Sequence, residues 1–173
     1  MIRQHKLRGH NFVHIGLVQV GIQPLTREGL DSSVLLQLRD ARHKNMNNSI
    51  LGIVESSLAN GPIHFDCYPN LKISLHDPHI LKILTLGIQT SGAINDMLEG
   101  SHTLALIYRI YYKCSKTNLN EQSLIKSPKG STILIQTSTK DANIKTPKSI
   151  QWKNVNLPQT WLVENENYSQ PQV

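Results

Sequence analysis

The sequence contains few cysteines and no long apolar run, and both absences narrow the class of protein. Its 173 residues include only Cys67 and Cys114, which allow at most one disulfide, so we expect a reducing compartment. The basic N-terminus has no apolar run of signal-peptide length behind it. No stretch approaches the roughly 18 apolar residues of a membrane helix, so we expect a protein that is soluble or peripheral to a membrane.

Charged residues and catalytic motifs are also scarce. Only 17% of the residues are charged, so Ser, Thr, Asn and Gln carry much of the surface, and this composition favours a β-rich protein over a helical bundle. The sequence lacks Gly-x-Ser-x-Gly, a phosphate-binding glycine loop, a dinucleotide fingerprint and His-Glu-x-x-His. These absences lower the expectation of an enzyme but do not exclude one, and we expect no cofactor and no small-molecule substrate.

The charge that is present is mostly positive. The net charge is +6 and the pI about 9.4, which favours polyanionic partners such as nucleic acid or an acidic membrane face. The length suits one domain with a substantial core.

The apolar pattern predicts mainly strands, separated by turn residues. The predicted strands are 12–25, 34–42, 63–68, 71–75, 80–90, 103–113 and 131–137. Apolar residues spaced by three and four between 45 and 62 predict one helix, ended by Gly61-Pro62. The segment 138–149 is predicted as a polar loop. Together these elements indicate an antiparallel sandwich or barrel.

Two enzyme-like sites can be imagined, and neither is favoured. The first is a zinc set of His64, Cys67, His76 and His79. In a strand, however, His64 and Cys67 would lie on opposite faces, so we predict no metal. The second is Asp31-Ser32-Ser33, which is similar to an aspartic protease loop but lacks its glycine.

The predicted strand 103–113 interleaves tyrosines with cations. Tyr108, Tyr111 and Tyr112 alternate with Arg109 and Lys113, a combination that can stack on bases and neutralise phosphates of a single strand. The alternative is a half-buried strand whose tyrosines close the edge of a core.

Asp40 is the least expected residue of the strand 34–42. It shares one face with Leu36, Leu38 and Arg42, where an acid is costly unless it is paired. The candidate partners are the backbone N–H groups of the following helix and the side chains of Arg39, Arg42 and Lys44. Asp40 would then tie the strand end to the helix; the alternative is an exposed ion pair that contributes little.

The motif Leu38-Arg39-Asp40, followed after a long gap by Gly92 or Gly100, carries a resemblance to a known family. The chain resembles the thirty-kilodalton superfamily of plant virus movement proteins, most closely the caulimovirus (pararetrovirus) type. The resemblance covers residues 12–163, including the blocks around 34–43 and 103–113. Of the two glycines, we favour Gly100 as the family glycine.

The resemblance implies a fold, and together with the polar composition of the two chain ends it divides the chain. It implies a mainly β, jelly-roll-like antiparallel β-sandwich with one helix after the second strand. Residues 1–11 would form a basic N-terminal arm, 12–163 the movement-protein domain and 164–173 a disordered polar tail. Leu38, Asp40 and Gly100 would be structural.

The resemblance also implies a function without catalysis. Members bind single-stranded DNA or RNA without sequence preference, associate with themselves and with plasmodesmal host proteins, and some form tubules or bind the viral capsid protein. We accordingly expect this chain at plasmodesmata and cell junctions of a plant host, with a cytoplasmic pool. The residues predicted to bind nucleic acid are Arg39, Arg42, Lys44, Arg109, Lys113 and Lys116.

A second hypothesis is of a different class. The chain would be a truncated endogenous viral copy, a capsid-like structural β-sandwich with no transport activity. Binding of single strands that weakens steeply with salt distinguishes the first hypothesis from the second.

Overall fold

The computed structural model describes residues 2–59, 61–117, 133–141, 144–155 and 157–161, with the backbone alone for residues 47 and 133–147. The elements in chain order are α1 (Ile2–Leu7), β1 (Phe12–Pro24), β2 (Ser32–Asp40), α2 (Met46–Ser49), β3 (Ile50–Ser57), β4 (Ile63–Cys67), β5 (Leu71–Ser74), α3 (Ile80–Ile83), β6 (Leu84–Gly92), η1 (Ala93–Asp96), β7 (Leu104–Ser115), β8 (Ile133–Asp141), β9 (Ile144–Ser149) and η2 (Trp152–Asn154). The mainly β prediction is confirmed. Among the described residues, no helix has the length and hydrophobicity needed to span a membrane.

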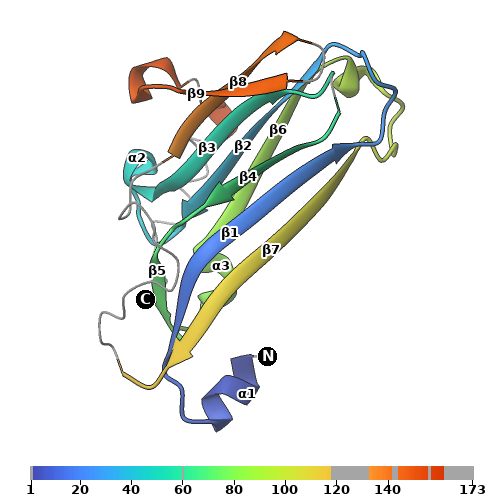
Figure 1. The fold of residues 1–173 in the computed structure, drawn as a ribbon. Helices are drawn as coiled ribbons and strands as arrows, with labels where there is room; N and C mark the ends of the chain where they lie inside the picture. Colours follow the sequence, from blue (N-terminus) through green and yellow to red (C-terminus); the bar gives the residue numbers. More distant parts are fainter. Residues whose placement is uncertain (1, 60, 118–132, 142–143, 156, 162–173) are drawn as a thin grey trace.

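The strands form two sheets that face each other (Figure 1). In sheet A, the long strand β1 pairs with β7 along one side, and on its other side with β5 near its start and β4 near its end. Sheet B has the order β6-β2-β3-β8-β9. All pairs are antiparallel except β3 with β8, which is parallel and departs from the predicted antiparallel sandwich.

The main core lies between the two sheets, because each contributes alternate apolar side chains to the space between them. The central rows are Val18, Val20 and Ile22 of β1 and Val34, Leu36 and Leu38 of β2. A smaller cluster lies on the other face of sheet B, where Trp161 packs with Ile50 and Ile53. Sheet B is therefore buried on both faces near β3.

The helix predicted over 45–62 is wrong for most of its length. Of the described residues in this range, those of α2 alone are α-helical, and the chain continues directly as β3, Ile50–Ser57. Val54 points into the main core while Ile53 points into the smaller cluster, so both faces of β3 carry apolar residues. A strand buried on both faces loses its polar alternation, and its apolar spacing then imitates that of a helix.

Two other segments also differ from the sequence prediction. The polar loop predicted at 138–149 is wrong, because β8 and β9 pair as an antiparallel hairpin through it. The strand predicted at 80–90 begins with one helical turn, α3, before β6. Most of the basic segment 1–11 forms the helix α1. The tail predicted at 164–173 lies outside the described residues.

The sandwich has an open side along β6 and β7. Within the described residues, each of these strands is paired on one side only. The register of β7 with β1 points Leu106, Tyr108 and Ile110 toward the same side as the core residues of β1, yet they are 42%, 66% and 38% exposed. Ile88 of β6 is similarly exposed.

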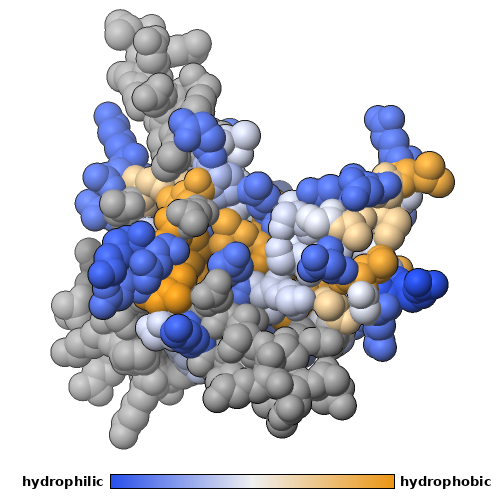
Figure 2. All heavy atoms as spheres, turned by 90° about the horizontal axis from the view of Figure 1, so that it is seen from above, coloured by the Kyte–Doolittle hydropathy of each residue, from blue (hydrophilic) through white to orange (hydrophobic). Residues whose placement is uncertain are grey.

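Hydrophobic side chains also reach the surface at the end of the sandwich where β1 stops. Leu25, Met97 and Leu98 are exposed there. Figure 2, seen from this end, shows hydrophobic residues at the surface between hydrophilic ones.

Candidate nucleic-acid interface

Asp40 is buried at the end of β2, on the face that carries Leu36 and Leu38 into the core. Its carboxylate accepts hydrogen bonds from Arg42: Nη2 to Oδ2 at 2.6 Å, Nε to Oδ1 at 2.9 Å, and the backbone N to Oδ1 at 3.0 Å. Arg42 also donates Nη1 to the carbonyl oxygen of Lys72 on β5, at 3.3 Å. The pair therefore joins the end of sheet B to sheet A.

The acid stays ionised in this environment. Burial alone would raise the pKa of Asp40, but the side-chain and backbone hydrogen bonds from Arg42 outweigh it, and the pKa lies below its ordinary value of 3.8. His43 Nε2 lies 3.8 Å from Oδ2 and favours the charged form further when protonated. Of the partners considered from sequence, Arg42 makes the close contacts. The carboxylate therefore holds the turn after β2 in place.

The remaining signature positions are Leu38 and the family glycine, and their environments differ. Leu38 is in the main core. Gly92 and Gly100 both have positive φ, +81° and +84°. A Cβ at Gly92 would clash with the carbonyl oxygen of Asp31, whereas one at Gly100 would meet no described atom within 4 Å. The backbone thus requires glycine more strictly at Gly92, although the sequence favoured Gly100.

The predicted nucleic-acid residues fall into two groups, and the first lies along β7. Arg109 and Lys113 alternate with the inward-facing residues of β7 and so project from the outer face of sheet A. Lys116 follows the strand directly, and its carbonyl oxygen accepts a hydrogen bond from Asn11 Nδ2 at 2.9 Å. Arg109 and Lys113 are exposed.

The register of sheet A extends this group across three strands. Lys72 of β5 is opposite His14 of β1, which is opposite Lys113 of β7. Paired residues of neighbouring strands point to the same face, so these three basic side chains form a row. Sequence analysis missed Lys72 and His14, because neither lies near 103–113 in the chain.

The tyrosines of β7 divide between its two faces. Tyr111 lies on the outer face, where its hydroxyl accepts a hydrogen bond from Arg109 Nη1 at 3.2 Å. Tyr108 and Tyr112 lie on the inner face, and Tyr112 packs edge-on against His5 of α1. Each of the two interpretations made from sequence applies to part of the strand. Tyr111 lies on the exposed face, as expected of a binding strand, whereas Tyr108 and Tyr112 lie at the edge of the core.

The second group lies at the end of β2. Arg39, Arg42 and Lys44 line a cavity of about 950 Å³ together with residues of α3 and β6. Lys82 of α3 also lines it and was missed from sequence, because only the fold brings α3 beside the end of β2. Arg39 is buried and donates Nη1 to Met46 Sδ at 3.6 Å.

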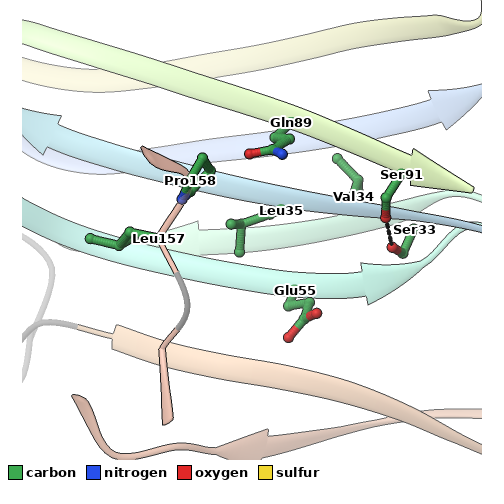
Figure 3. A pocket seen from close by; sticks show the side chains of 8 residues that line it. All are labelled: Ser33, Val34, Leu35, Glu55, Gln89, Ser91, Leu157 and Pro158. Atoms are coloured by element: carbon green, nitrogen blue, oxygen red, sulfur yellow. Dashed lines mark hydrogen bonds between the residues drawn. The ribbon is translucent and has the colours of Figure 1, made fainter. Parts of the chain in front are cut away.

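A smaller cavity of about 190 Å³ lies on the outer side of sheet B (Figure 3). Leu157 and Pro158 lie over it, and the hydroxyls of Ser33 and Ser91 share a hydrogen bond of 2.5 Å at its end. Glu55 is the charged residue among the described ones that line it. An acidic lining makes this cavity unsuited to a phosphate.

The residues considered for zinc are not gathered by the fold. In the described part of the chain, no three His, Cys, Asp or Glu side chains are placed to hold a metal ion. On β4, His64 is exposed while Cys67 is buried, and burial raises the pKa of the Cys67 thiol to about 12. A protonated, buried thiol is neither a ready nucleophile nor a ready metal ligand.

Comparison with known proteins gives one consistent result. A family model described as viral movement protein matches residues 1–127. The movement protein of soybean chlorotic mottle virus is 32% identical over 117 residues, which are 68% of this chain and 38% of that protein. The movement protein of figwort mosaic virus (strain DxS) is 30% identical over 131 residues, 76% of this chain and 39% of that protein.

A third relative extends the same picture. The movement protein of cauliflower mosaic virus (strain BBC) is 27% identical over 108 residues, 62% of this chain and 33% of that protein. The chain thus spans less than two-fifths of the length of each of these relatives. No solved structure matches it.

Proposed function

This chain belongs to the viral movement protein family, and we propose that it serves the cell-to-cell movement of a plant virus by binding single-stranded nucleic acid, without catalysis, on the outer face of sheet A. The observation that carries this proposal is the row of Lys72, His14 and Lys113, which continues along β7 to Tyr111 and Arg109.

The spacing of this row suits a polyanionic strand. Neighbouring strands of a sheet lie about 4.8 Å apart, so Lys72 and Lys113, on either side of β1, can contact two phosphates of one extended backbone. His14 lies between them, with its ring Nε2 2.6 Å from Asn70 Oδ1. Exposed lysine and arginine side chains strengthen the binding of nucleic acid chiefly because they release counterions from the phosphates. Tyr111 adds a ring on which a base can stack.

These contacts do not distinguish one base from another. Phosphate contacts fix position, and stacking accepts every base because each has a π-face. The proposed binding therefore has no sequence preference and accepts DNA and RNA alike.

The remaining parts of the proposal concern place and partners. We propose that the protein acts at plasmodesmata, with a cytoplasmic pool, and associates with copies of itself through the open side formed by β6 and β7. An unpaired strand edge with exposed apolar side chains is a template for pairing with another chain. Tubules, plasmodesmal host proteins and the viral capsid protein are further expected partners of the assembled form.

The test is a binding titration with a fluorescein-labelled oligo-dT, followed by anisotropy at several salt concentrations. Affinity should fall steeply with salt, and Arg109→Ala/Lys113→Ala should lower the slope of log affinity against log salt by about 0.7 for each phosphate that the variant no longer neutralises. Arg27→Ala/Lys153→Ala removes the same charge from exposed sites in the loop after β1 and in η2, and is the matched control.

Either of two results would reject the proposal. One is no binding near physiological salt, which favours the structural β-sandwich without transport activity. The other is an equal loss of affinity in both double variants, which would mean that net charge alone, and not this face, binds the strand.

A further inference from the structure

The large cavity at the end of β2 is built differently from the outer face of sheet A. Its volume of about 950 Å³ lies at the upper end of the range of small-molecule sites. It is lined from β2, the loop after β2, α3 and β6, with Trp161 in its wall. It therefore offers a concave site where sheet A offers a flat one.

The inner part of the cavity holds polar atoms that lack partners among the described residues. Gln37 is 3% exposed, and its Oε1 accepts no hydrogen bond from them; the buried Oγ1 of Thr85 likewise has no partner there. Both residues line the cavity. Buried polar atoms are nearly always paired, so an amide oxygen and a hydroxyl at this depth are suited to bind polar groups of a ligand.

The wall beside these atoms is apolar and closely packed. Trp161 lines the cavity on the same face of sheet B as Gln37, whereas Leu86, also in the lining, points to the opposite face and into the main core. Gly87 lets the backbone of β6 approach Trp161 closely, because a Cβ there would lie 3.0 Å from Gln37 Cγ and 3.2 Å from Trp161 Cζ2. A flat, partly apolar group can lie against this wall while its polar edge reaches Gln37.

The mouth of the cavity is basic even with Arg42 paired to Asp40. Among the described residues, the lining cations are Arg39, Arg42, Lys44 and Lys82, against one lining acid, Asp77. Arg42, Lys44 and Lys82 are exposed, so they lie on the solvent side of the cavity, whereas Arg39 is buried within it. Asp77 already accepts a hydrogen bond from the backbone N of His79, at 2.7 Å. This arrangement suits a phosphate at the mouth.

We propose that this cavity binds a nucleoside monophosphate unit. Its base lies against Trp161, a donor on the base meets Gln37 Oε1, and its phosphate lies between Lys44 and Lys82. The inference goes beyond the proposed function, because none of these residues lies on the outer face of sheet A. A free nucleotide and the phosphorylated end of a strand share this chemistry.

Calorimetric titration of the intact chain with AMP, adenosine and inorganic phosphate tests the inference. AMP should bind, and adenosine should bind about tenfold or more weakly, as expected for the loss of a charge-assisted contact. Lys82→Glu, an exposed substitution at the mouth, should weaken AMP by a similar factor, while Lys113→Glu on sheet A should leave it unchanged within about twofold. An AMP affinity equal in Lys82→Glu and wild type, or no AMP binding at millimolar concentration, overturns the inference.

Two oligonucleotides, one with and one without a 5′-phosphate, identify the source of the ligand. If a 5′-phosphate raises the affinity of a single strand and Lys82→Glu removes that gain, the occupant is a strand end; if AMP binds and the 5′-phosphate has no effect, the occupant is a free nucleotide. Strand binding that depends on Lys113 without any AMP binding would reject the cavity inference and leave the function proposed for sheet A intact.

Discussion

Asp40 shows at the scale of one residue how a charge is tolerated on the inner face of a strand. The sequence correctly places it on one face with Leu36 and Leu38 and names Arg42 among its partners. What the sequence could not show is how the two meet. The strand ends at Asp40, and the chain then turns so that the guanidinium and backbone N–H of Arg42 both reach the carboxylate.

We expect Asp40→Asn to lower the free energy of unfolding at pH 7 by about 2 kcal/mol, because it replaces charge-assisted hydrogen bonds with neutral ones. The folded pKa of Asp40 is depressed, so its contribution is complete above the ordinary value of 3.8 and is lost as pH falls through the folded pKa. Urea unfolding of both proteins at pH 7, 5 and 2.5 measures this. Equal stability at pH 7, or a difference that grows in acid, would contradict the structural role.

Removal of the cation should cost more than removal of the acid. Arg42→Ala leaves the buried carboxylate of Asp40 without its guanidinium partner, and because the side chain of Arg42 is itself 41% exposed, the cost should lie near the lower end of the range of about 3–5 kcal/mol for a fully buried pair. Arg42→Lys keeps the charge but loses the two-pronged contact, so its cost should be intermediate. Lys44→Ala, an exposed neighbour, should change stability by less than about 0.5 kcal/mol. If Arg42→Ala were as mild as Lys44→Ala, Arg42 would not hold the turn.

At the scale of elements, β1 and β2 were predictable as strands and β3 was not. β1 and β2 keep enough alternation for their pattern to show. β3 lies between two apolar clusters, and the residues that make the second cluster, such as Trp161, come from a distant part of the chain. Local periodicity cannot distinguish such a strand from a helix.

The two candidate signature glycines can be separated by stability. Gly100→Ala should cost about 1 kcal/mol, from positive φ alone. Gly92→Ala should cost about 3 kcal/mol, because the clash with the carbonyl of Asp31 adds an overpacking penalty. Thermal unfolding of the two variants compares them. A greater loss in Gly100→Ala would contradict the close approach of Gly92 to the backbone of Asp31.

The open edge of β7 predicts association between copies. Wild type should form larger species as its concentration rises, and Tyr108→Lys should suppress them, because a lysine on the inner side of an edge strand opposes edge-to-edge pairing. Ile107→Lys is a matched control: Ile107 is 65% exposed against 66% for Tyr108, but it lies on the outer face. Sedimentation velocity measures the association of both variants. Equal suppression by the two variants would place the contact elsewhere.

At the scale of the whole molecule, the proposed interface depends more on the register of the paired strands in sheet A than on any sequence motif. The sequence identified Arg109, Lys113 and Tyr111 from one strand. It could not identify Lys72 and His14, because their alignment with Lys113 arises when β1 pairs with β5 on one side and β7 on the other. Long-range pairing of this kind leaves no local signal, so the row of basic residues emerges only from the fold.

Ultraviolet cross-linking of the intact chain to oligo-dT, with the attachment site read by mass spectrometry, tests the central claim most directly. Trypsin cuts after Arg109 and Lys113, so the peptide 110–113 isolates Tyr111 and Tyr112 from Tyr108. We predict cross-links at Tyr111, on the outer face of sheet A, that disappear at high salt. Cross-links at Tyr108 or Tyr112 without Tyr111, or only at residues outside sheet A, would contradict the account.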